Sequence, residues 1–177
     1  MSAQRLRFLL EGRPGIGKTT IARRLVESLR ERGFPLRGFT TEEIRQGGRR
    51  IGFAVETVLG HRAVLARMDL AGPPRVGRYG VDLAAFEKLV LQELRRPTIG
   101  EVFVVDELGK MELASARFRE AVTDLLEREV SIVATVHVYR HPFTEALKGR
   151  ADVEVIRVNA RNRQELPARL LERLNVG

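Results

Sequence analysis

The chain has 177 residues, 44% of them hydrophobic, which suits one domain with a substantial core. It has no cysteine, which excludes disulfides, thiolate zinc sites and thiol nucleophiles, and no apolar stretch approaches the roughly 18–20 residues that cross a bilayer. Lys and Arg number 31 against 23 Asp and Glu, a formal net charge of +8, but the arginines are scattered in pairs such as Arg23-Arg24 and Arg95-Arg96. We therefore expect a single monomeric domain over residues 1–177, located in the cytoplasm, with no membrane partner and with small polyanionic ligands rather than nucleic acid.

The first predicted strand, at about residues 4–10, leads into the most informative segment, residues 12–19. This segment fits the phosphate-loop pattern G-x-x-x-x-G-K-S/T (Walker A) at every fixed position. A helix predicted over about residues 18–32 follows, with Ile21 and Leu25 on its apolar face. A strand, a glycine-rich turn and a helix N-terminus in this order form a concavity of backbone N–H groups that suits a di- or triphosphate. The segment therefore predicts nucleotide binding.

Each residue type in this loop has a physical reason. The glycines allow backbone conformations and a close approach to phosphate that a Cβ would prevent. Lys18 can reach the β- and γ-phosphates, and the Thr19 hydroxyl lies where Mg²⁺ would bridge them, which makes Mg²⁺ the expected cofactor. Thr20 fits an α-phosphate donor and an ordinary first-turn residue equally well. The expected nucleotide contacts here are Gly12, Arg13, Pro14, Gly15, Ile16, Gly17, Lys18, Thr19 and Thr20.

The segment after the first helix has a different pattern. Residues 36–44 and 50–58 are predicted strands separated by a Gln-Gly-Gly hairpin signal, and residues 61–68 are a third. We expect an antiparallel ribbon over about residues 36–68, attached to the main sheet or its edge. Residues 71–80 are rich in Gly and Pro, which predicts a loop without regular structure that could close over a ligand.

Helices and strands alternate through the remainder of the chain. Asp82 is typical of an N-cap for a helix that carries Phe86 and Leu94 on one face. There follow a buried strand at 102–105, a helix around 118–126, a strand at 132–136, a short helix near 142–148, a strand at 153–158 and a helix at about 164–174. This alternation predicts an α/β fold of the phosphate-loop NTPase type, a three-layer sandwich with a mostly parallel sheet and helices on both faces.

Two carboxylates, Asp106 and Glu107, come directly after the predicted strand at 102–105 (the Walker B position). Ligands of open α/β sheets bind at the carboxyl ends of the strands. Asp106 would hold Mg²⁺ through its bound waters, because Mg²⁺ gives up its hydration reluctantly. Glu107 would orient and polarise the attacking water as a general base. Together with Lys18, these carboxylates are the expected catalytic residues.

Other polar side chains are further candidates for the site. Thr135 and His137 end a predicted strand, and a neighbouring strand would bring them close to the γ-phosphate. A threonine bonded to nearby backbone and a structural histidine remain alternatives. Charge that develops on the transferred phosphoryl group calls for a cation beyond Lys18 and the metal. The candidate cations are Arg13, Arg78 and Arg140.

Several short sequence segments, spread along nearly the whole chain, are typical of one protein family when they occur together. They are the phosphate loop, Gly38-Phe39-Thr40-Thr41-Glu42-Glu43-Ile44-Arg45 with Arg50-Ile51-Gly52-Phe53, Arg78-Tyr79-Gly80-Val81-Asp82, Val105-Asp106-Glu107-Leu108-Gly109-Lys110-Met111-Glu112-Leu113, and Asn162-Arg163. With them the chain resembles the nucleoside-triphosphatase family of thermophilic microbes, whose human relative is called cancer-related nucleoside-triphosphatase. The phosphate loop is generic, whereas the string that contains Lys110 is far more specific to this family.

The resemblance implies Mg²⁺-dependent hydrolysis of nucleoside 5′-triphosphates (ATP, GTP, CTP, UTP and TTP) to diphosphate and phosphate, with loose choice of base. It carries nucleotide contacts over to the phosphate loop and to a second segment, and it suggests Asn162 and Arg163 as contacts to the base. The second segment consists of Val102, Phe103, Val104, Val105, Asp106, Glu107, Leu108 and Gly109. The departures from the family pattern are Leu108, where Ile or Val is commoner, and a late Val-Asn-Ala-Arg-Asn-Arg string that does not begin with Thr.

Three other functions remain open for the same residues. A kinase would pass the γ-phosphate to a nucleoside or another small hydroxyl compound, with Glu107 deprotonating the acceptor. A nucleic-acid-stimulated ATPase would use the net charge of +8, and a nucleotide switch would hydrolyse slowly to time a partner interaction. A guanine-specific GTPase and a transporter-type ATPase are disfavoured, because the chain has neither an Asn-Lys-x-Asp nor a Leu-Ser-Gly-Gly-Gln string.

Overall fold

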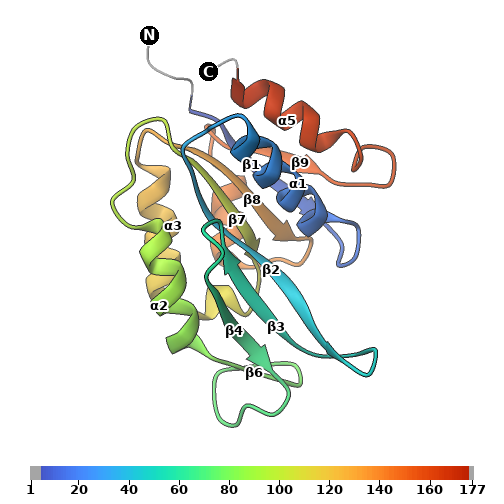
Figure 1. Ribbon diagram of the computed structural model, residues 1–177. Helices are drawn as coiled ribbons and strands as arrows, with labels where there is room; N and C mark the ends of the chain where they lie inside the picture. The colour runs from blue at the N-terminus through green and yellow to red at the C-terminus, as the bar shows by residue number, and fades with distance from the viewer. Residues whose placement is uncertain (1–4, 176–177) are drawn as a thin grey trace.

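The computed structural model describes residues 5–175, which form an α/β fold with one nine-stranded sheet and five α-helices (Figure 1). The strands are β1 (Arg7–Gly12), β2 (Leu36–Gln46), β3 (Arg49–Thr57), β4 (Arg62–Arg67), β5 (Arg75–Val76), β6 (Tyr79–Val81), β7 (Val102–Leu108), β8 (Ser131–His137) and β9 (Glu154–Arg157). The helices are α1 (Lys18–Glu31), α2 (Leu83–Leu94), α3 (Ala116–Leu126), α4 (Pro142–Lys148) and α5 (Leu166–Asn175), with a 3-10 turn η1 (Glu112–Ala114). The predicted start of the first strand at residue 4 lies outside the described residues.

The strands follow the order β5-β6-β4-β3-β2-β7-β8-β1-β9, in two halves with different pairing. From β2 through β7, β8 and β1 to β9 the neighbouring strands are parallel, whereas from β2 through β3, β4 and β6 to β5 they are antiparallel. The predicted ribbon is confirmed, and it is attached through β2, which pairs with β7 on one edge and with β3 on the other. The sheet as a whole is therefore mixed.

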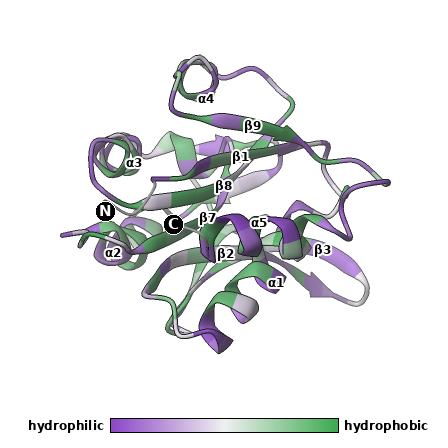
Figure 2. Cartoon of the chain, turned by 90° about the horizontal axis from the view of Figure 1, so that it is seen from above, coloured by the Kyte–Doolittle hydropathy of each residue, from purple (hydrophilic) through white to green (hydrophobic). Residues whose placement is uncertain are grey.

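Helices cover both faces of the sheet, as predicted, because the central strands are apolar on both sides (Figures 1 and 2). Val102 and Val104 of β7 pack in a core with α1 and α5, whereas Phe103 and Val105 pack in a second core with α2 and α3. Side chains of a strand alternate between the two faces, so a strand buried on both sides needs a continuous apolar run. None of the helices in the described part of the chain has the length and apolar composition needed to cross a membrane.

The prediction that residues 71–80 lack regular structure was wrong in part. Residues 75–81 form a small hairpin in which Val76 pairs with Tyr79, and β6 adds this hairpin to the edge strand β4. The Tyr79 side chain is buried, and its ring meets the ring of Phe53 edge to face with centroids 5.3 Å apart. This tertiary contact stabilises two short strands that the local Gly and Pro content disfavours.

The strand that carries the two carboxylates is longer than predicted. β7 continues through Asp106 and Glu107 to Leu108, so the carboxylates lie inside the strand. Its pairing with β8 is interrupted at this point, because Val105 lies opposite Ala134 and the next paired residue is Leu108. The interruption lies at the two acidic residues, Asp106 and Glu107. An irregularity of this kind in a strand changes the directions in which its side chains point.

Candidate active site

The loop between β1 and α1 holds Lys18 at the first turn of the helix. Gly17 precedes it with a φ of 114°, in the left-handed region that favours glycine. The Lys18 side chain is buried, its Nζ donates a hydrogen bond to the Gly12 carbonyl, and it lies 3.4 Å from Oε2 of Glu107. The parallel register of β1 and β8 places Gly12 beside His137, so the loop begins next to the end of β8.

Asp106 is fully buried and accepts hydrogen bonds from three threonines. Oδ1 accepts from the Thr135 hydroxyl at 2.7 Å and from the Thr19 hydroxyl at 3.1 Å. Oδ2 accepts from the Thr41 backbone N–H at 3.1 Å and from its hydroxyl at 3.3 Å. Burial raises the pKa of Asp106, and the hydrogen bonds from Thr135, Thr41 and Thr19 oppose this rise only in part. The Asp106 carboxylate is thus held between the first turn of α1 and the strands β2 and β8.

Glu107 is half-buried and lies between the side chains of Lys18 and His137. Its Oε1 is 2.7 Å from Nε2 of His137, and its Oε2 is 3.4 Å from Nζ of Lys18. Burial by itself would raise the pKa of Glu107, but the hydrogen bond from His137 and the charge of Lys18 lower it below its ordinary value. Glu107 is therefore an ionised carboxylate with a fixed orientation at the mouth of the loop.

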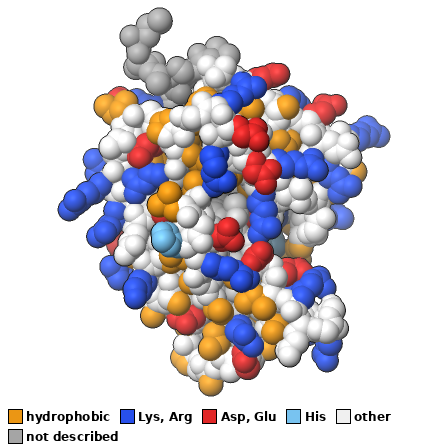
Figure 3. All heavy atoms as spheres, viewed as in Figure 1, with side chains coloured by type: hydrophobic (Ala, Val, Ile, Leu, Met, Phe, Trp, Pro, Cys, Tyr) orange, Lys and Arg blue, Asp and Glu red, His pale blue; other side chains and the backbone are white. Residues whose placement is uncertain are grey.

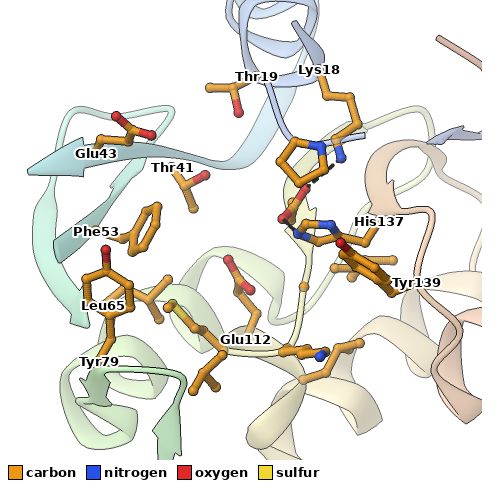
Figure 4. A pocket seen from close by; sticks show the side chains of 18 of the residues that line it. Lys18, Thr19, Thr41, Glu43, Phe53, Leu65, Tyr79, Glu112, His137 and Tyr139 are labelled. Atoms are coloured by element: carbon orange, nitrogen blue, oxygen red, sulfur yellow. Dashed lines mark ion pairs between the residues drawn. The ribbon is translucent and has the colours of Figure 1, made fainter. Parts of the chain in front are cut away.

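A cavity of about 810 Å³ connects the loop to the antiparallel ribbon. In Figure 4, Lys18 lies at one end, Phe53 and Tyr79 form the wall on the ribbon side, and His137 and Tyr139 form the opposite wall. The loop, β7, β8 and the ribbon each supply a wall, so the site exists only where these elements meet.

The ribbon wall carries a cluster of cations around one phenol. The Tyr79 hydroxyl accepts from Nε of Arg50 at 3.0 Å and from the Arg78 guanidinium at 3.3 Å. Burial alone would raise the pKa of Tyr79, but the hydrogen bonds from Arg50 and Arg78 lower it below its ordinary value. Arg50 also pairs with Glu43, with 3.0 Å between Nη1 and Oε1. Arg78, a predicted transition-state cation, thus lies beside Tyr79 in the ribbon wall of the cavity rather than beside Lys18.

The other predicted residues differ in where they lie. Two threonines, Thr135 and Thr19, contact Asp106, and His137 contacts Glu107. Thr20 and Arg140 line the cavity without a recorded bond to Asp106 or Glu107 among the described residues. The side chains of residues 102–105 are buried in the two cores, so they position Asp106 and do not face the cavity.

Three predicted contacts lie apart from the cavity. Arg13 is exposed in the loop. Arg163 donates from Nη1 to the Ile16 carbonyl at 3.2 Å and so supports the loop from outside. Asn162 donates from Nδ2 to the Arg157 carbonyl at 2.8 Å and accepts from the Asn159 backbone N–H, which shapes the turn after β9.

The structure adds two site residues that the sequence analysis missed. Thr41 comes from the ribbon and contacts Asp106. Its signals in the sequence were a hydroxyl in a predicted strand and its place in a string that the chain shares with the family. Glu112, in η1, is 5% exposed, and its carboxylate points into the cavity (Figure 4). Burial, together with the charge of Glu107, raises the pKa of Glu112 well above its ordinary value. Nothing in the local pattern around Glu112 indicates that this glutamate is buried, because η1 is a short turn without periodicity.

The oxygen donors at the loop fit a divalent cation. The Thr19 hydroxyl and the Asp106 carboxylate converge within 3.1 Å, and both are the hard donors that Mg²⁺ prefers. Burial of the Asp106 carboxylate makes an adjacent cation favourable, since its hydrogen-bonding partners within residues 5–175 are neutral threonines. Thr19 and Asp106 are thus the residues that would hold the metal, together with water and phosphate oxygens.

Comparisons with known proteins agree with this geometry. The model of the family described as NTPase matches residues 7–171. Nucleoside-triphosphatase THEP1 of Thermotoga maritima is 41% identical over 162 residues, which cover 91% of each chain. Cancer-related nucleoside-triphosphatase of Homo sapiens is 43% identical over 171 residues, covering 89% of this chain and 90% of the human one.

Two solved structures have the same fold. The crystal structure of THEP1 from Aquifex aeolicus matches with a TM-score of 0.84 and 31% identity, covering 96% of this chain and 99% of its own. The solution structure of a human cancer-related nucleoside triphosphatase matches with a TM-score of 0.85 and 41% identity, covering 98% of this chain and 99% of its own. The similarity therefore extends over almost the whole of the fold.

Proposed function

The chain belongs to the NTPase family, and from this membership and the geometry of the cavity we propose that it hydrolyses nucleoside 5′-triphosphates to nucleoside diphosphate and phosphate. The observation that carries the proposal is that Nζ of Lys18 and Oε2 of Glu107 lie 3.4 Å apart in one cavity. The buried Asp106 precedes Glu107 in β7 and accepts a hydrogen bond from Thr19, which lines the same cavity. A phosphate-loop lysine, a buried metal-binding carboxylate and a carboxylate base are the groups that this reaction requires. Residues 1–177 would act as one monomeric phosphate-loop domain in the cytoplasm.

The loop and Lys18 bind the substrate in this proposal. Free backbone N–H groups of the loop between Gly12 and Thr19 bind phosphate oxygens at the N-terminus of α1 in this proposal, because the helix dipole there favours anions. Lys18 contacts the β- and γ-phosphates as a point charge. These contacts involve the triphosphate that all nucleoside triphosphates share, which supports loose choice among ATP, GTP, CTP, UTP and TTP.

The metal is Mg²⁺ in this proposal, held by the Thr19 hydroxyl and, through water, by Asp106. When bound, Mg²⁺ neutralises charge on the phosphate oxygens and orients them. Thr135 and Thr41 keep the Asp106 carboxylate in one orientation, since each donates to it. The threonines are therefore positioning residues.

Glu107 acts as the general base. It accepts a proton from a water molecule whose oxygen forms a bond to the γ-phosphorus, while the bond from that phosphorus to the β,γ-bridging oxygen breaks and the diphosphate leaves with the electron pair. His137 holds Glu107 in place through the hydrogen bond at 2.7 Å. Lys18 remains close enough to offset the negative charge that accumulates at the γ-phosphate.

The alternatives have less support. The relatives are named triphosphatases rather than kinases, which favours water as the phosphoryl acceptor. A nucleic-acid-stimulated ATPase needs a continuous basic surface. On the face that Figure 3 shows, Lys and Arg (blue) are dispersed, with acidic and apolar side chains between them.

The test is phosphate release from ATP, GTP, CTP and UTP with Mg²⁺, comparing the wild type with Glu107→Gln, with and without added RNA. We expect similar turnover on all four nucleotides, no stimulation by RNA, and a loss of about 10²–10⁴-fold in Glu107→Gln with nucleotide binding retained. Hydrolysis by Glu107→Gln at the wild-type rate would show that Glu107 is not the base.

A matched pair of lysine variants tests the binding role. Lys18→Ala should weaken ATP binding by about 30-fold or more, because removing a buried charge contact costs about 2–5 kcal/mol. Lys88→Ala, at an exposed position of α2, is the control and should bind ATP as the wild type does. Titration calorimetry with a non-hydrolysable ATP analogue measures both. Equal affinities of the two variants would contradict the role of Lys18.

A further inference from the structure

The cavity extends well past the place of the γ-phosphate. In an in-line displacement, the attacking group approaches the phosphorus from the side opposite the leaving diphosphate. Under the proposed function, Glu107 marks that side. Hydrolysis requires a single water there, with a volume of about 30 Å³. The cavity of about 810 Å³ includes the phosphate loop, where the triphosphate lies under the proposed function, and continues past Glu107 to Phe53 and Tyr79. The part on the ribbon side is lined by residues outside the phosphate loop.

We call this outer part of the cavity the second chamber. It is lined by Phe53, Leu65, Val76, Tyr79, Met111 and Glu112. Four of these residues come from the ribbon strands β3 and β4 and from the hairpin strands β5 and β6, so the hairpin that was not predicted forms part of the wall. The lining is therefore built by segments that the phosphate loop does not need.

The wall on the ribbon side suits a flat ring. The rings of Phe53 and Tyr79 meet edge to face at 5.3 Å, and the Arg50 guanidinium lies 5.2 Å from the Phe53 centroid. Arg50 is held there by hydrogen bonds to Tyr79 and Glu43. Aromatic rings fixed by packing and by cation contacts offer a rigid apolar surface on which another ring can pack.

The floor and the inner end of the second chamber supply polar groups. Glu112 is only 5% exposed, yet its carboxyl group points into the chamber rather than into the core (Figure 4). Backbone N–H groups of Gly109 and Glu112 hydrogen-bond to this carboxyl group, whose oxygens can accept further hydrogen bonds from the chamber side. Glu107 bounds the chamber at its inner end. A ligand that carries a hydroxyl or comparable polar group beside its ring therefore finds acceptors here.

We propose that the second chamber is a binding site for a second small molecule, a hydroxylated compound of nucleoside size with a flat ring, which sits in front of Glu107 and excludes the attacking water. Its ring packs on Phe53 and Tyr79, and a hydroxyl group faces Glu112 or Glu107. The position in front of the γ-phosphate rests on the proposed function, whereas binding to the chamber does not. Phosphate release should fall as this ligand binds.

The experiment measures binding to the full chain with the nucleotide site occupied. Adenosine, cytidine, guanosine, uridine and pyridoxine are each titrated into protein saturated with ADP and Mg²⁺, and binding is followed by saturation-transfer NMR and calorimetry. Ribose, which has hydroxyls and no flat ring, is the control ligand. We expect at least one ring compound to bind at micromolar to millimolar concentration, ribose not to bind, and ATP hydrolysis to fall at the same ligand concentration.

Two variants assign the binding to the second chamber. Val76→Trp fills the chamber from the short strand β5 and should weaken binding at least tenfold. Phe53→Ala removes the stacking wall and should also weaken it. Leu59→Trp makes the same kind of enlargement at a turn residue that is 74% exposed, and should bind as the wild type does. Thermal melting of each variant confirms folding before binding is compared.

Several outcomes would overturn the proposal. These are the absence of binding by every ring compound, equal binding to wild type and both chamber variants, and displacement of the compound by ADP, which would place it in the nucleotide site. A phosphorylated nucleoside formed from ATP in the ³¹P spectrum would support binding in front of Glu107, with the hydroxyl oxygen bonding to the γ-phosphorus, its proton passing to Glu107 and the diphosphate leaving. The same result would overturn the proposed function, because water would then not be the phosphoryl acceptor. Failure of ATP hydrolysis alone would overturn the proposed function and leave the binding result intact.

Discussion

His137 lies with its Nε2 2.7 Å from Oε1 of Glu107, while its Nδ1 is buried and has no partner among the described residues. The ring is therefore committed to one hydrogen bond, which orients the carboxylate. A hydrogen bond to a charged group contributes about 1.5–3 kcal/mol. The two residues come from neighbouring parallel strands, β7 and β8, and meet where the pairing of these strands is interrupted.

His137→Phe should lower kcat for ATP by about 10–100-fold, because Glu107 loses the donor that orients it. KM should change less than threefold, since the ring does not bind phosphate in the proposed arrangement. His61→Phe changes an exposed histidine in the same way and is the control. Steady-state kinetics measure the split. A rise in KM at unchanged kcat would show that His137 acts on substrate binding and not through Glu107.

Thr135→Val should destabilise the protein by about 1–3 kcal/mol, because the fully buried Asp106 loses its shortest hydrogen bond, at 2.7 Å. The Mg²⁺ concentration for half-maximal hydrolysis should rise tenfold or more, as for other partners of metal-binding carboxylates. Urea denaturation and Mg²⁺ titration measure the two effects. Thr123→Val, at an exposed position of α3, is the control and should change neither. Wild-type Mg²⁺ dependence in Thr135→Val would mean that Asp106 needs no positioning from β8.

Gly109→Ala should reduce hydrolysis by about tenfold or more. A Cβ at this position would lie 2.8 Å from Oε2 of Glu112 and 3.0 Å from Oε1 of Glu107, so the side chains of both glutamates must move. A shift of about 1 Å in a reacting group can lower the rate by up to about 10²-fold. Gly149→Ala meets only ordinary contacts, the nearest at 3.6 Å, and serves as the control. Full activity of Gly109→Ala would show that the carboxylate of Glu107 tolerates displacement.

Asp152→Asn should lower stability at neutral pH by about 1 kcal/mol, the upper end for a pair with an exposed partner. The buried Arg7 guanidinium pairs with Asp152 and donates to the Arg128 carbonyl at 3.1 Å, so the substitution leaves its charge uncompensated. Asp124→Asn removes an exposed helical pair and is the control, with a loss below about 0.5 kcal/mol.

The pH dependence of this pair has a definite sign. The hydrogen bond from Arg150 and the charge of Arg7 keep the pKa of Asp152 below its ordinary value of 3.8. A carboxyl group whose pKa is lower in the folded state stabilises the fold above its unfolded pKa, and this contribution disappears as the pH falls through the folded pKa. The stability difference between wild type and Asp152→Asn should therefore be constant at neutral pH and shrink below about pH 4. A difference that grows on acidification would contradict this assignment.

Much of the fold and the phosphate half of the candidate site could be predicted from the sequence. The strand, glycine-rich loop and helix around Lys18 form one local unit, so the pattern of residues 12–19 predicts their order and geometry directly. The apolar run before Asp106 predicts a central strand because such a strand is buried on both faces. The ribbon was predicted from two strand segments and the Gln-Gly-Gly hairpin signal between them, which are also local.

Other features depended on contacts between segments far apart in the sequence. The hairpin of β5 and β6 forms because Tyr79 packs on Phe53, and the contact of Asp106 with Thr41 and Thr135 exists only once β2, β7 and β8 lie side by side. Burial of Glu112 likewise follows from packing around the cavity. The sequence by itself determined the local units, since propensity and periodicity act over a few residues. Only the tertiary structure decided which polar groups surround the two carboxylates and how large the cavity is, because side-chain burial and strand adjacency arise from long-range packing.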